Sequence, residues 1–154
     1  MRQKRKIIEG AAYHVTSRTN GKFPAFESSL GRKIMLITLE NAKEKYGFRL
    51  HNFCIMPTHI HLLITPNSGT DLSRIMQWIK THSAKRWNCI NNSKDHLWGE
   101  RFFARQINTL DDYFVVQNYI DQNPVNAGLV SNAQDWEACG AYYIANGISG
   151  FIEM

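Results

Sequence analysis

Hydrophobic and polar residues alternate along this chain with two different periods, and these periods predict where strands and helices lie. Residues 11–18 (AAYHVTSR) are rich in β-branched and aromatic side chains, which is typical of a strand. Residues 48–56 and 59–65 are two further apolar runs, and the short Pro57-Thr58 segment between them indicates a tight connection. Residues 101–107 (RFFARQI) complete a predicted set of four strands.

Two segments between these strands repeat their apolar residues every three or four positions, which predicts helices. The first is expected over about residues 27–46, with Gly47 where a C-terminal cap belongs. Its apolar positions lie on adjacent stripes: Leu30, Ile34, Ile37, Met35 and Leu39. Thr70 or Asp71 can cap the second helix, which runs to about Asn88. Its predicted core positions are Leu72, Ile75, Met76 and Ile79.

A third helix is predicted over residues 110–122, after the last strand. The order β-α-β-β-α-β is that of the ferredoxin-like split βαβ motif, an α+β fold in which helices cover one face of an antiparallel sheet. The additional helix follows the last strand. A length of 154 residues, without repeats or a Pro/Gly/Ser-rich linker, indicates a single domain over residues 1–154. Its tail, residues 131–154, is poorly specified by the sequence.

Composition excludes several classes of protein. Hydrophobic residues make up 44% and charged residues 20%, which is typical of a globular chain rather than a disordered or collagen-like one. No apolar run approaches the roughly 18 residues of a membrane span, and the basic N-terminus lacks the apolar core of a secretory signal. The three cysteines are far apart and form no C-x-x-C pair, which indicates reduced thiols: Cys54, Cys89 and Cys139. We therefore expect a cytoplasmic protein without a membrane partner.

Charge is distributed unevenly along the chain. All 18 Lys and Arg residues lie at or before Arg105 with 7 acidic residues, so residues 1–105 carry +11, whereas residues 106–154 hold 6 acidic residues and carry −6. A basic body favours a polyanionic partner, most often nucleic acid, although an ordinary soluble surface also accounts for it. Residues 1–10 form a basic arm that either binds DNA or solubilises the chain through Arg2, Lys4, Arg5 and Lys6.

Two histidines share one face of the third predicted strand. Alternation sends Ile60, Leu62 and Ile64 to one side and His59 and His61 to the other. Two neutral imidazoles at i and i+2 can bind one metal ion. The pattern alone is weak, since two histidines on a partly solvated sheet face account for it more often than a metal site does. The other histidines have no partner at ligand spacing and are expected to be structural: His14, His51, His82 and His96.

A second candidate group lies in the third helix. Tyr119 and Asn123 are four residues apart and therefore share a helix face. Pro124 disfavours a helical conformation for the residue before it, so Asn123 is expected to end the helix, where its amide oxygen can turn toward a metal. Tyr119 is a credible nucleophile only if a base or cation favours its phenolate. Taken alone, the segment is explained better by a packed tyrosine beside a capping asparagine.

A third candidate is the face of the second helix that carries Arg74, Gln77, Trp78, Thr81 and Lys85. Cations beside an aromatic ring can grip phosphates and stack an unpaired base, although Trp78 also fits a core position. Further candidate DNA contacts are Arg18, Arg101 and Arg105.

Three motifs occur together in a familiar order: YHVTSR at 13–18, MPTHIHLL at 56–63 and YIDQNPVNAGLV at 119–130. Their joint occurrence resembles the IS200/IS605-like single-tyrosine transposases of the HUH superfamily, and is most similar to the branch of REP-associated tyrosine transposases. The resemblance covers most of the chain, from about residue 11 to 130. Asn126 departs from the pattern, since this branch often has a basic residue there.

The resemblance implies roles for four residues. Tyr119 matches the nucleophile, and His59, His61 and Asn123 match the ligands of a divalent metal, Mg²⁺ or Mn²⁺. The implied activity is cleavage and rejoining of single-stranded DNA next to hairpins through a 5′-phosphotyrosine. The implied partner is single-stranded or hairpin DNA, bound by a monomer or by a homodimer that shares the tyrosine helix. Two alternatives stay open: a non-catalytic DNA-hairpin-binding protein of the same fold, and a small metal-dependent hydrolase.

Overall fold

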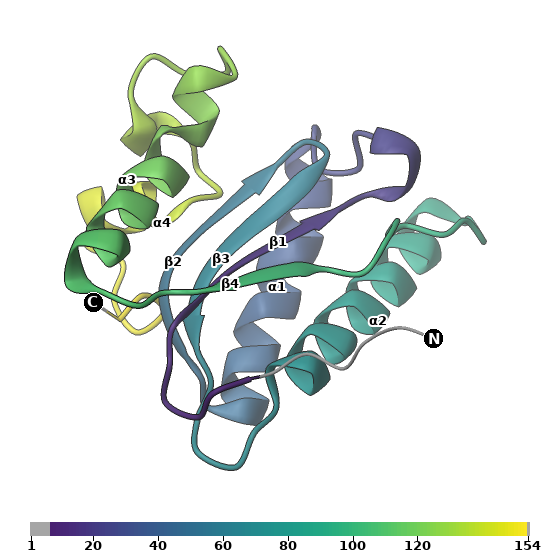
Figure 1. The fold of residues 1–154 in the computed structure, drawn as a ribbon. Coiled ribbons are helices and arrows are strands. Elements are labelled where there is room, and N and C mark those ends of the chain that lie inside the picture. The colour runs from purple at the N-terminus through teal and green to yellow at the C-terminus, as the bar shows by residue number, and fades with distance from the viewer. Residues whose placement is uncertain (1–6, 154) are drawn as a thin grey trace.

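A computed structural model describes residues 7–153 and contains one four-stranded antiparallel sheet in the order β2-β3-β1-β4. The strands are β1 (Tyr13–Arg18), β2 (Arg49–Met56), β3 (His59–Thr65) and β4 (Phe103–Gln106). Helices α1 (Ser29–Tyr46) and α2 (Leu72–Asn91) lie together behind the sheet (Figure 1). The predicted α+β fold is therefore confirmed.

The face toward α1 and α2 holds the main hydrophobic core. Alternate strand residues such as Val15, Phe53 and Leu62 are fully buried there. The four core positions predicted for α2 are all buried. The stripe predicted for α1 was too wide, since Leu30 and Ile37 are 51% and 50% exposed. A helix that packs on one sheet and one neighbouring helix buries only part of its circumference.

Predicted helix caps are present at both helices of this layer. Asp71 accepts a hydrogen bond from the Ser73 N–H at the start of α2, as predicted. At the start of α1, Ser28, which was not predicted as a cap, accepts one from the Gly31 N–H. Gly47 ends α1 with φ 67°, a left-handed conformation that favours glycine. These local signals fix where both helices meet the sheet.

Helix α3 (Leu110–Asn126) packs on the opposite face, over β2 and β3. Val116 and Ile120 of α3 form a small second core with residues on the far side of the sheet from α1 and α2, namely Cys54, Met56, Leu63 and Cys139. Beyond α3 the same face is open over β1 and β4, where Arg18, Phe103 and Arg105 are exposed. The candidate site lies along the border between the covered and the open half.

The expected end of α3 at Asn123 was wrong, because the helix continues through Pro124 to Asn126. Proline removes one N–H group from the last turn, but that turn is still closed by two other N–H groups. Ala127 donates to the Asn123 carbonyl at 3.0 Å and Leu129 to the Pro124 carbonyl at 2.9 Å. Asn123 therefore projects from a regular helix, one turn after Tyr119.

The C-terminal segment, which the sequence specifies poorly, packs along the outer edge of β2. It contains a short 3-10 helix, η2 (Ala133–Asp135), and α4 (Gly140–Ala145). Ile55 donates a backbone hydrogen bond to Ala138, and the Trp136 indole N–H donates to the Ile55 carbonyl at 2.9 Å. Farther along, Glu153 donates its N–H to Leu50 at 2.8 Å. This segment therefore extends the sheet by irregular pairing.

Three other predictions concern the ends and the cysteines. Most of the basic arm, residues 1–6, lies outside the described residues. Cys54, Cys89 and Cys139 are all free, as expected. Among residues 7–153, no helix combines the length and the apolar character that crossing a membrane requires.

Candidate functional site

Strand register arranges the candidate residues in two rows across the open face of the sheet. In antiparallel pairs, residues opposite each other project to the same side. One row runs across all four strands through Cys54, His61, Thr16 and Phe103, and the next runs through Met56, His59 and Arg18. The two histidines are thus flanked by the second hydrophobic core on one side and by open polar surface on the other.

Helix α3 brings Tyr119 and Asn123 over these histidines. The Tyr119 ring centroid lies 5.6 Å from that of His61, and the two rings are nearly perpendicular. Tyr119 is 51% exposed. The Asn123 side chain donates to the Tyr119 carbonyl at 3.3 Å and lies close enough to both histidines to oppose, in small part, the lowering of their pKa values. The four residues singled out by the sequence therefore lie together.

The environment keeps both histidines neutral. Burial, with smaller contributions from the nearby His59, His14 and Arg18, lowers the pKa of His61 to about 3 against the opposing effect of Asn123. Burial also lowers the pKa of His59, with a smaller contribution from the Arg18 guanidinium. A neutral imidazole offers the nitrogen lone pair that a metal ion binds. The site therefore holds both rings in the metal-binding protonation state at neutral pH.

Contacts of the ring nitrogens indicate which nitrogens are available. His61 Nδ1 lies 3.1 Å from His14 Nε2 and 3.2 Å from Thr16 Oγ1, whereas His61 Nε2 is buried without a hydrogen bond of normal geometry to any residue within 7–153. His59 Nδ1 lies 3.1 Å from Thr58 Oγ1. A buried nitrogen without a partner is costly, and a bound cation would satisfy it. The Nε2 atom of His61 thus fits a metal ligand.

Asn123 is the residue beside the two histidines that could supply a third ligand through its side-chain amide. Residues 7–153 contain no group of three His, Cys, Asp or Glu side chains that could hold a metal ion. Asn123 lies against both histidines and carries an amide oxygen, a ligand that divalent cations accept. Two imidazoles and one amide oxygen would leave coordination positions free for a substrate.

His14 belongs to the site although its spacing in the sequence gave no indication of it. Its ring stacks on His61 at a centroid distance of 5.2 Å and lies 5.8 Å from that of Tyr119. The pairing of β1 with β3 creates this contact, and cross-strand register is not visible in a single sequence. The available signal was alternation in β1, which places His14 on the polar face with Thr16.

Candidate DNA contacts divide into two groups. Arg18 lies beside His59, and Arg101 precedes β4 on the same open side, while Arg105 forms two hydrogen bonds with Asp112 at 3.0 and 3.1 Å. The α2 residues lie behind the sheet and do not line the site: Arg74, Trp78 and Lys85. The Trp78 ring packs at the edge of the main core and stacks on His82 at 3.9 Å.

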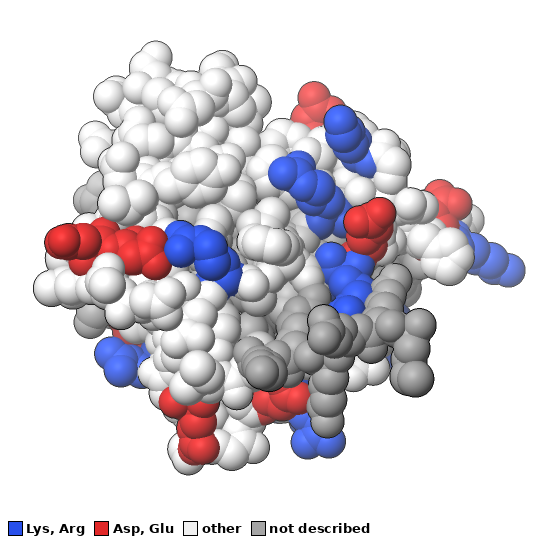
Figure 2. Space-filling view, viewed as in Figure 1, with Lys and Arg blue, Asp and Glu red and all other residues white. Residues whose placement is uncertain are grey.

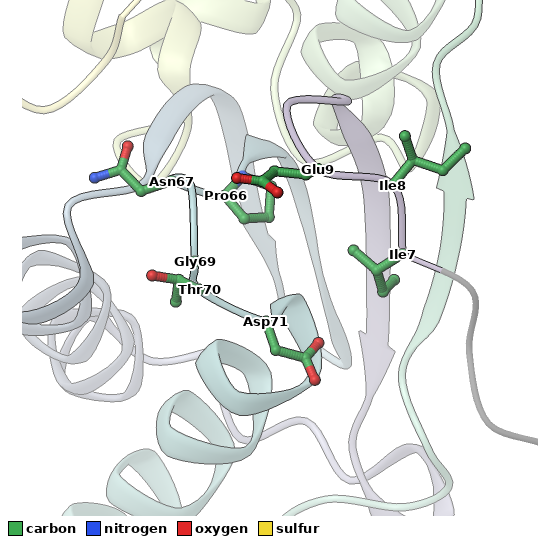
Figure 3. Close-up of a pocket in the computed structure, with 8 residues that line it drawn as sticks. All are labelled: Ile7, Ile8, Glu9, Pro66, Asn67, Gly69, Thr70 and Asp71. Carbon is green, nitrogen blue, oxygen red and sulfur yellow. The ribbon is translucent and has the colours of Figure 1, made fainter.

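Two pockets differ in their suitability for a phosphate. A groove of about 420 Å³ adjoins the site and is lined by Thr16, Arg18 and Arg101 among others. Another pocket, of about 320 Å³, lies past the far end of β3 and carries the carboxylates of Glu9 and Asp71 (Figure 3). Phosphate is repelled by carboxylates and attracted by guanidinium groups, so the groove beside the histidines is the better anion site.

Comparison with known proteins supplies the family. The family described as Transposase IS200 like matches residues 8–123, a range that includes all four residues of the site. The chain belongs to this family. The match ends at Asn123, so the lysine-free C-terminal segment lies beyond it.

One curated protein is similar in sequence to this IS200-like transposase. A protein of Haemophilus influenzae, provisionally named a REP-associated tyrosine transposase, is 29% identical over 103 residues, which are 60% of this chain and 58% of that protein. The chain therefore spans little more than half the length of that relative.

Two solved structures share the fold. A REP-associated tyrosine transposase bound to a REP hairpin matches with a TM-score of 0.79 and 20% identity, over 100% of this chain and 91% of the other. A Deinococcus radiodurans protein, provisionally classed as a transposase, matches with a TM-score of 0.56 and 17% identity, over 79% of this chain and 97% of the other. At these identities the likeness shows the fold alone.

Proposed function

We propose that this chain is a metal-dependent transesterase that cleaves and rejoins single-stranded DNA beside hairpins, with Tyr119 as the nucleophile. The observation that carries the proposal is the position of Tyr119, half exposed and beside His61, next to a buried imidazole nitrogen that lacks a partner. Membership of the IS200-like transposases supports the reaction class. A structural neighbour bound to a REP hairpin supports the choice of DNA.

In the proposed reaction, the Tyr119 phenol oxygen forms a bond to the scissile phosphorus as the bond from phosphorus to the 3′-oxygen breaks. The phenol proton passes to solvent, and the departing oxygen takes up a proton to give a free 3′-hydroxyl. The DNA is left attached through a 5′-phosphotyrosine, which conserves the phosphoester energy. A 3′-hydroxyl can therefore reverse the step and rejoin the strands without ATP.

His59, His61 and Asn123 are the residues proposed to hold a divalent ion, which would polarise the scissile phosphate and balance its negative charge. Two imidazoles suit Mn²⁺ better than Mg²⁺, which prefers oxygen ligands, so we expect Mn²⁺ to support at least equal activity. The Arg18 guanidinium, next to His59 in the register, is placed to attract the same phosphate.

One chain is sufficient for this arrangement. Helix α3 packs on the sheet of its own chain and brings Tyr119 to the histidines of the same chain. We therefore propose that the tyrosine acts in cis. Two results together would contradict this part of the proposal. Sedimentation would show a dimer, and a mixture of a Tyr119 variant with a His59 variant would regain the activity that each lacks alone.

The test is formation of a covalent protein–DNA band. Labelled single-stranded hairpin DNA from the flanks of the gene is incubated with the protein and Mg²⁺ or Mn²⁺, and the products are separated on a denaturing gel. We expect a band that disappears in Tyr119→Phe and in His59→Ala. Tyr142→Phe, on α4, is the matched control and should retain it.

Other outcomes would identify the alternatives. Binding of a hairpin without any covalent band would support a non-catalytic DNA-binding protein. Cleavage that survives Tyr119→Phe would indicate a hydrolase that uses the histidines without a covalent intermediate.

A further inference from the structure

The groove beside the histidines begins at a residue of the candidate site. Thr16 lines this groove and also lies 3.2 Å from His61 Nδ1. From there the groove, of about 420 Å³, extends over the end of β1 to the segment before β4. Anything bound in it would therefore lie immediately next to a phosphate at the histidines.

An exposed aromatic ring forms one wall of the groove. Phe103 is 65% exposed and lies in the same row as Thr16 and His61, on the open face of the sheet. Within residues 7–153, no ring contact involves Phe103, whereas Phe23 and Phe26 pack on tryptophans. An aromatic side chain that is left open on a sheet face offers a platform for an unpaired base.

Three cations line the same groove without a carboxylate partner. In the described part of the chain, no salt bridge involves Arg18, Lys22 or Arg101, and Glu100 is the single acidic residue among the groove's lining. By contrast, Arg105 is paired with Asp112. Basic side chains, with acidic ones between them, project over the right-hand half of this side of the molecule, while the surface over α3 is almost free of basic side chains (Figure 2). The groove therefore carries unpaired positive charge.

Backbone hydrogen bonds hold the walls of the groove together. Gly99 donates to the Arg18 carbonyl at 3.0 Å, and Asn20 donates to the Leu97 carbonyl at 2.9 Å. A Cβ at Gly99 would lie 3.3 Å from the Thr19 carbonyl oxygen, so this close approach favours glycine. Lys22 has φ 58°, a strained conformation that persists only where the surroundings fix it. The groove is thus preformed rather than created by a ligand.

We propose that this groove binds one unpaired nucleotide of single-stranded DNA next to the scissile phosphate. The base stacks on Phe103, and the phosphate lies beside Lys22 and Arg101, with Arg18 shared between it and the scissile phosphate. The inference rests on the proposed function because it uses the same DNA strand. It adds a second binding position, separate from the histidines and from Tyr119.

The test compares two probes that differ only in their bases: fluorescein-labelled (dT)10 and an abasic oligomer with the same phosphates. Binding is measured by fluorescence anisotropy at several salt concentrations. Wild type should bind (dT)10 more tightly than the abasic probe. Phe103→Ala should weaken (dT)10 binding about tenfold and leave binding of the abasic probe unchanged.

Cation variants should act on both probes alike. Lys22→Ala and Arg101→Ala should each weaken both complexes and reduce the salt slope by about 0.7, the value for one lost phosphate contact on a single strand. Phe114→Ala and Lys33→Ala are the matched controls, since Phe114 is 59% exposed on α3 and Lys33 is exposed on α1. Both controls should bind like wild type. Circular dichroism verifies that each variant is folded.

The outcomes separate this inference from the proposed function. If Phe103→Ala keeps the wild-type preference for (dT)10, or if wild type binds neither probe, the nucleotide groove is wrong even when Tyr119 forms its covalent band. If Phe103→Ala loses the preference but wild type forms no covalent band, the groove stands and the transesterase proposal fails.

Discussion

The two faces of the sheet are built from alternate residues of the same strands, yet they differ in nearly every physical respect. The face toward α1 and α2 is sealed, with Val15, Ile60 and Leu62 fully buried. The other face is covered by α3 over half its width, and its border carries His59 and His61. The difference shows that one strand can serve stability through one set of side chains and chemistry through the other.

Adjacent substitutions on β3 provide the strongest test of this separation. Leu62→Ala should remove about 2–5 kcal/mol from the free energy of unfolding, because it leaves a cavity in the main core. His61→Ala should abolish the covalent DNA band while the protein stays folded. Thermal unfolding and the denaturing gel measure both properties for both variants. If His61→Ala were as destabilised as Leu62→Ala, the functional face would also be a main source of stability.

His14 tests whether the chemical face extends from β3 onto β1. We expect His14→Phe to lower the affinity for Mn²⁺ about 10–100-fold, because loss of a hydrogen-bonded partner leaves a ligating imidazole poorly oriented. His14→Gln can still accept a hydrogen bond from His61 Nδ1 and should lie closer to wild type. Titration calorimetry with Mn²⁺ measures this without DNA. Equal affinities for all three proteins would restrict the site to β3 and α3.

A polar link between β2 and α3 tests how the half-covered face holds its helix. The Asn52 amide, 2% exposed, donates to the Asp121 carboxylate at 2.8 Å. Asn52→Ala should cost about 1–3 kcal/mol of unfolding free energy, since it leaves a partly buried acceptor without its donor. It should also raise the pKa of Asp121, which burial already raises and the Asn52 hydrogen bond lowers. Urea unfolding measures the loss, and an unchanged midpoint would indicate that apolar contacts alone hold α3.

Glu153 should give the smallest effect, since its ion pairs with Lys43 and Arg49 belong to neither face. Its hydrogen bond with Lys43 lowers the pKa of Glu153 below the ordinary value of 4.5. The stabilisation of the folded state by this ion pair is therefore present above pH 4.5 and is lost as the pH falls through the lowered pKa. The Glu153 side chain is 44% exposed, so we expect the ion pair to contribute well under about 1 kcal/mol. Glu153→Gln should remove that part of the acid dependence in thermal unfolding between about pH 6 and pH 3. An identical acid profile in both proteins would show that the pair contributes nothing.

Local patterns in the sequence predicted the faces of β3 but not their neighbours. Alternation placed His59 and His61 on one side and Leu62 on the other, because side-chain direction in a strand depends only on position. Contact between His14 and His61 depends on which strands pair, and a distance of 47 residues along the chain hides it.

The predicted buried face of α1 and the predicted end of α3 were wrong because contacts with the rest of the fold determine both. Periodicity indicated that Leu30 and Ile37 are apolar positions of α1, but the sheet and α2 cover only part of the helix, so both are exposed. Pro124 correctly indicated a region near the end of α3, but the following N–H groups preserve the last turn and move the end to Asn126. Trp78 illustrates a third limit, since an aromatic residue between cations has the same pattern whether its ring meets a base or packs against the protein.

The C-terminal segment protects the outer edge of β2 from other molecules. Backbone groups of β2, including the Ile55 and Leu50 pairs with Ala138 and Glu153, are occupied along the sheet's outer edge. A bare edge strand readily pairs with strands of other molecules and leads to aggregation. A protein shortened before Trp136 would keep every residue of the candidate site, yet it would present an unprotected edge to its neighbours. Such a truncation would therefore lower solubility, and it would also remove Cys139 from the second core on which α3 packs.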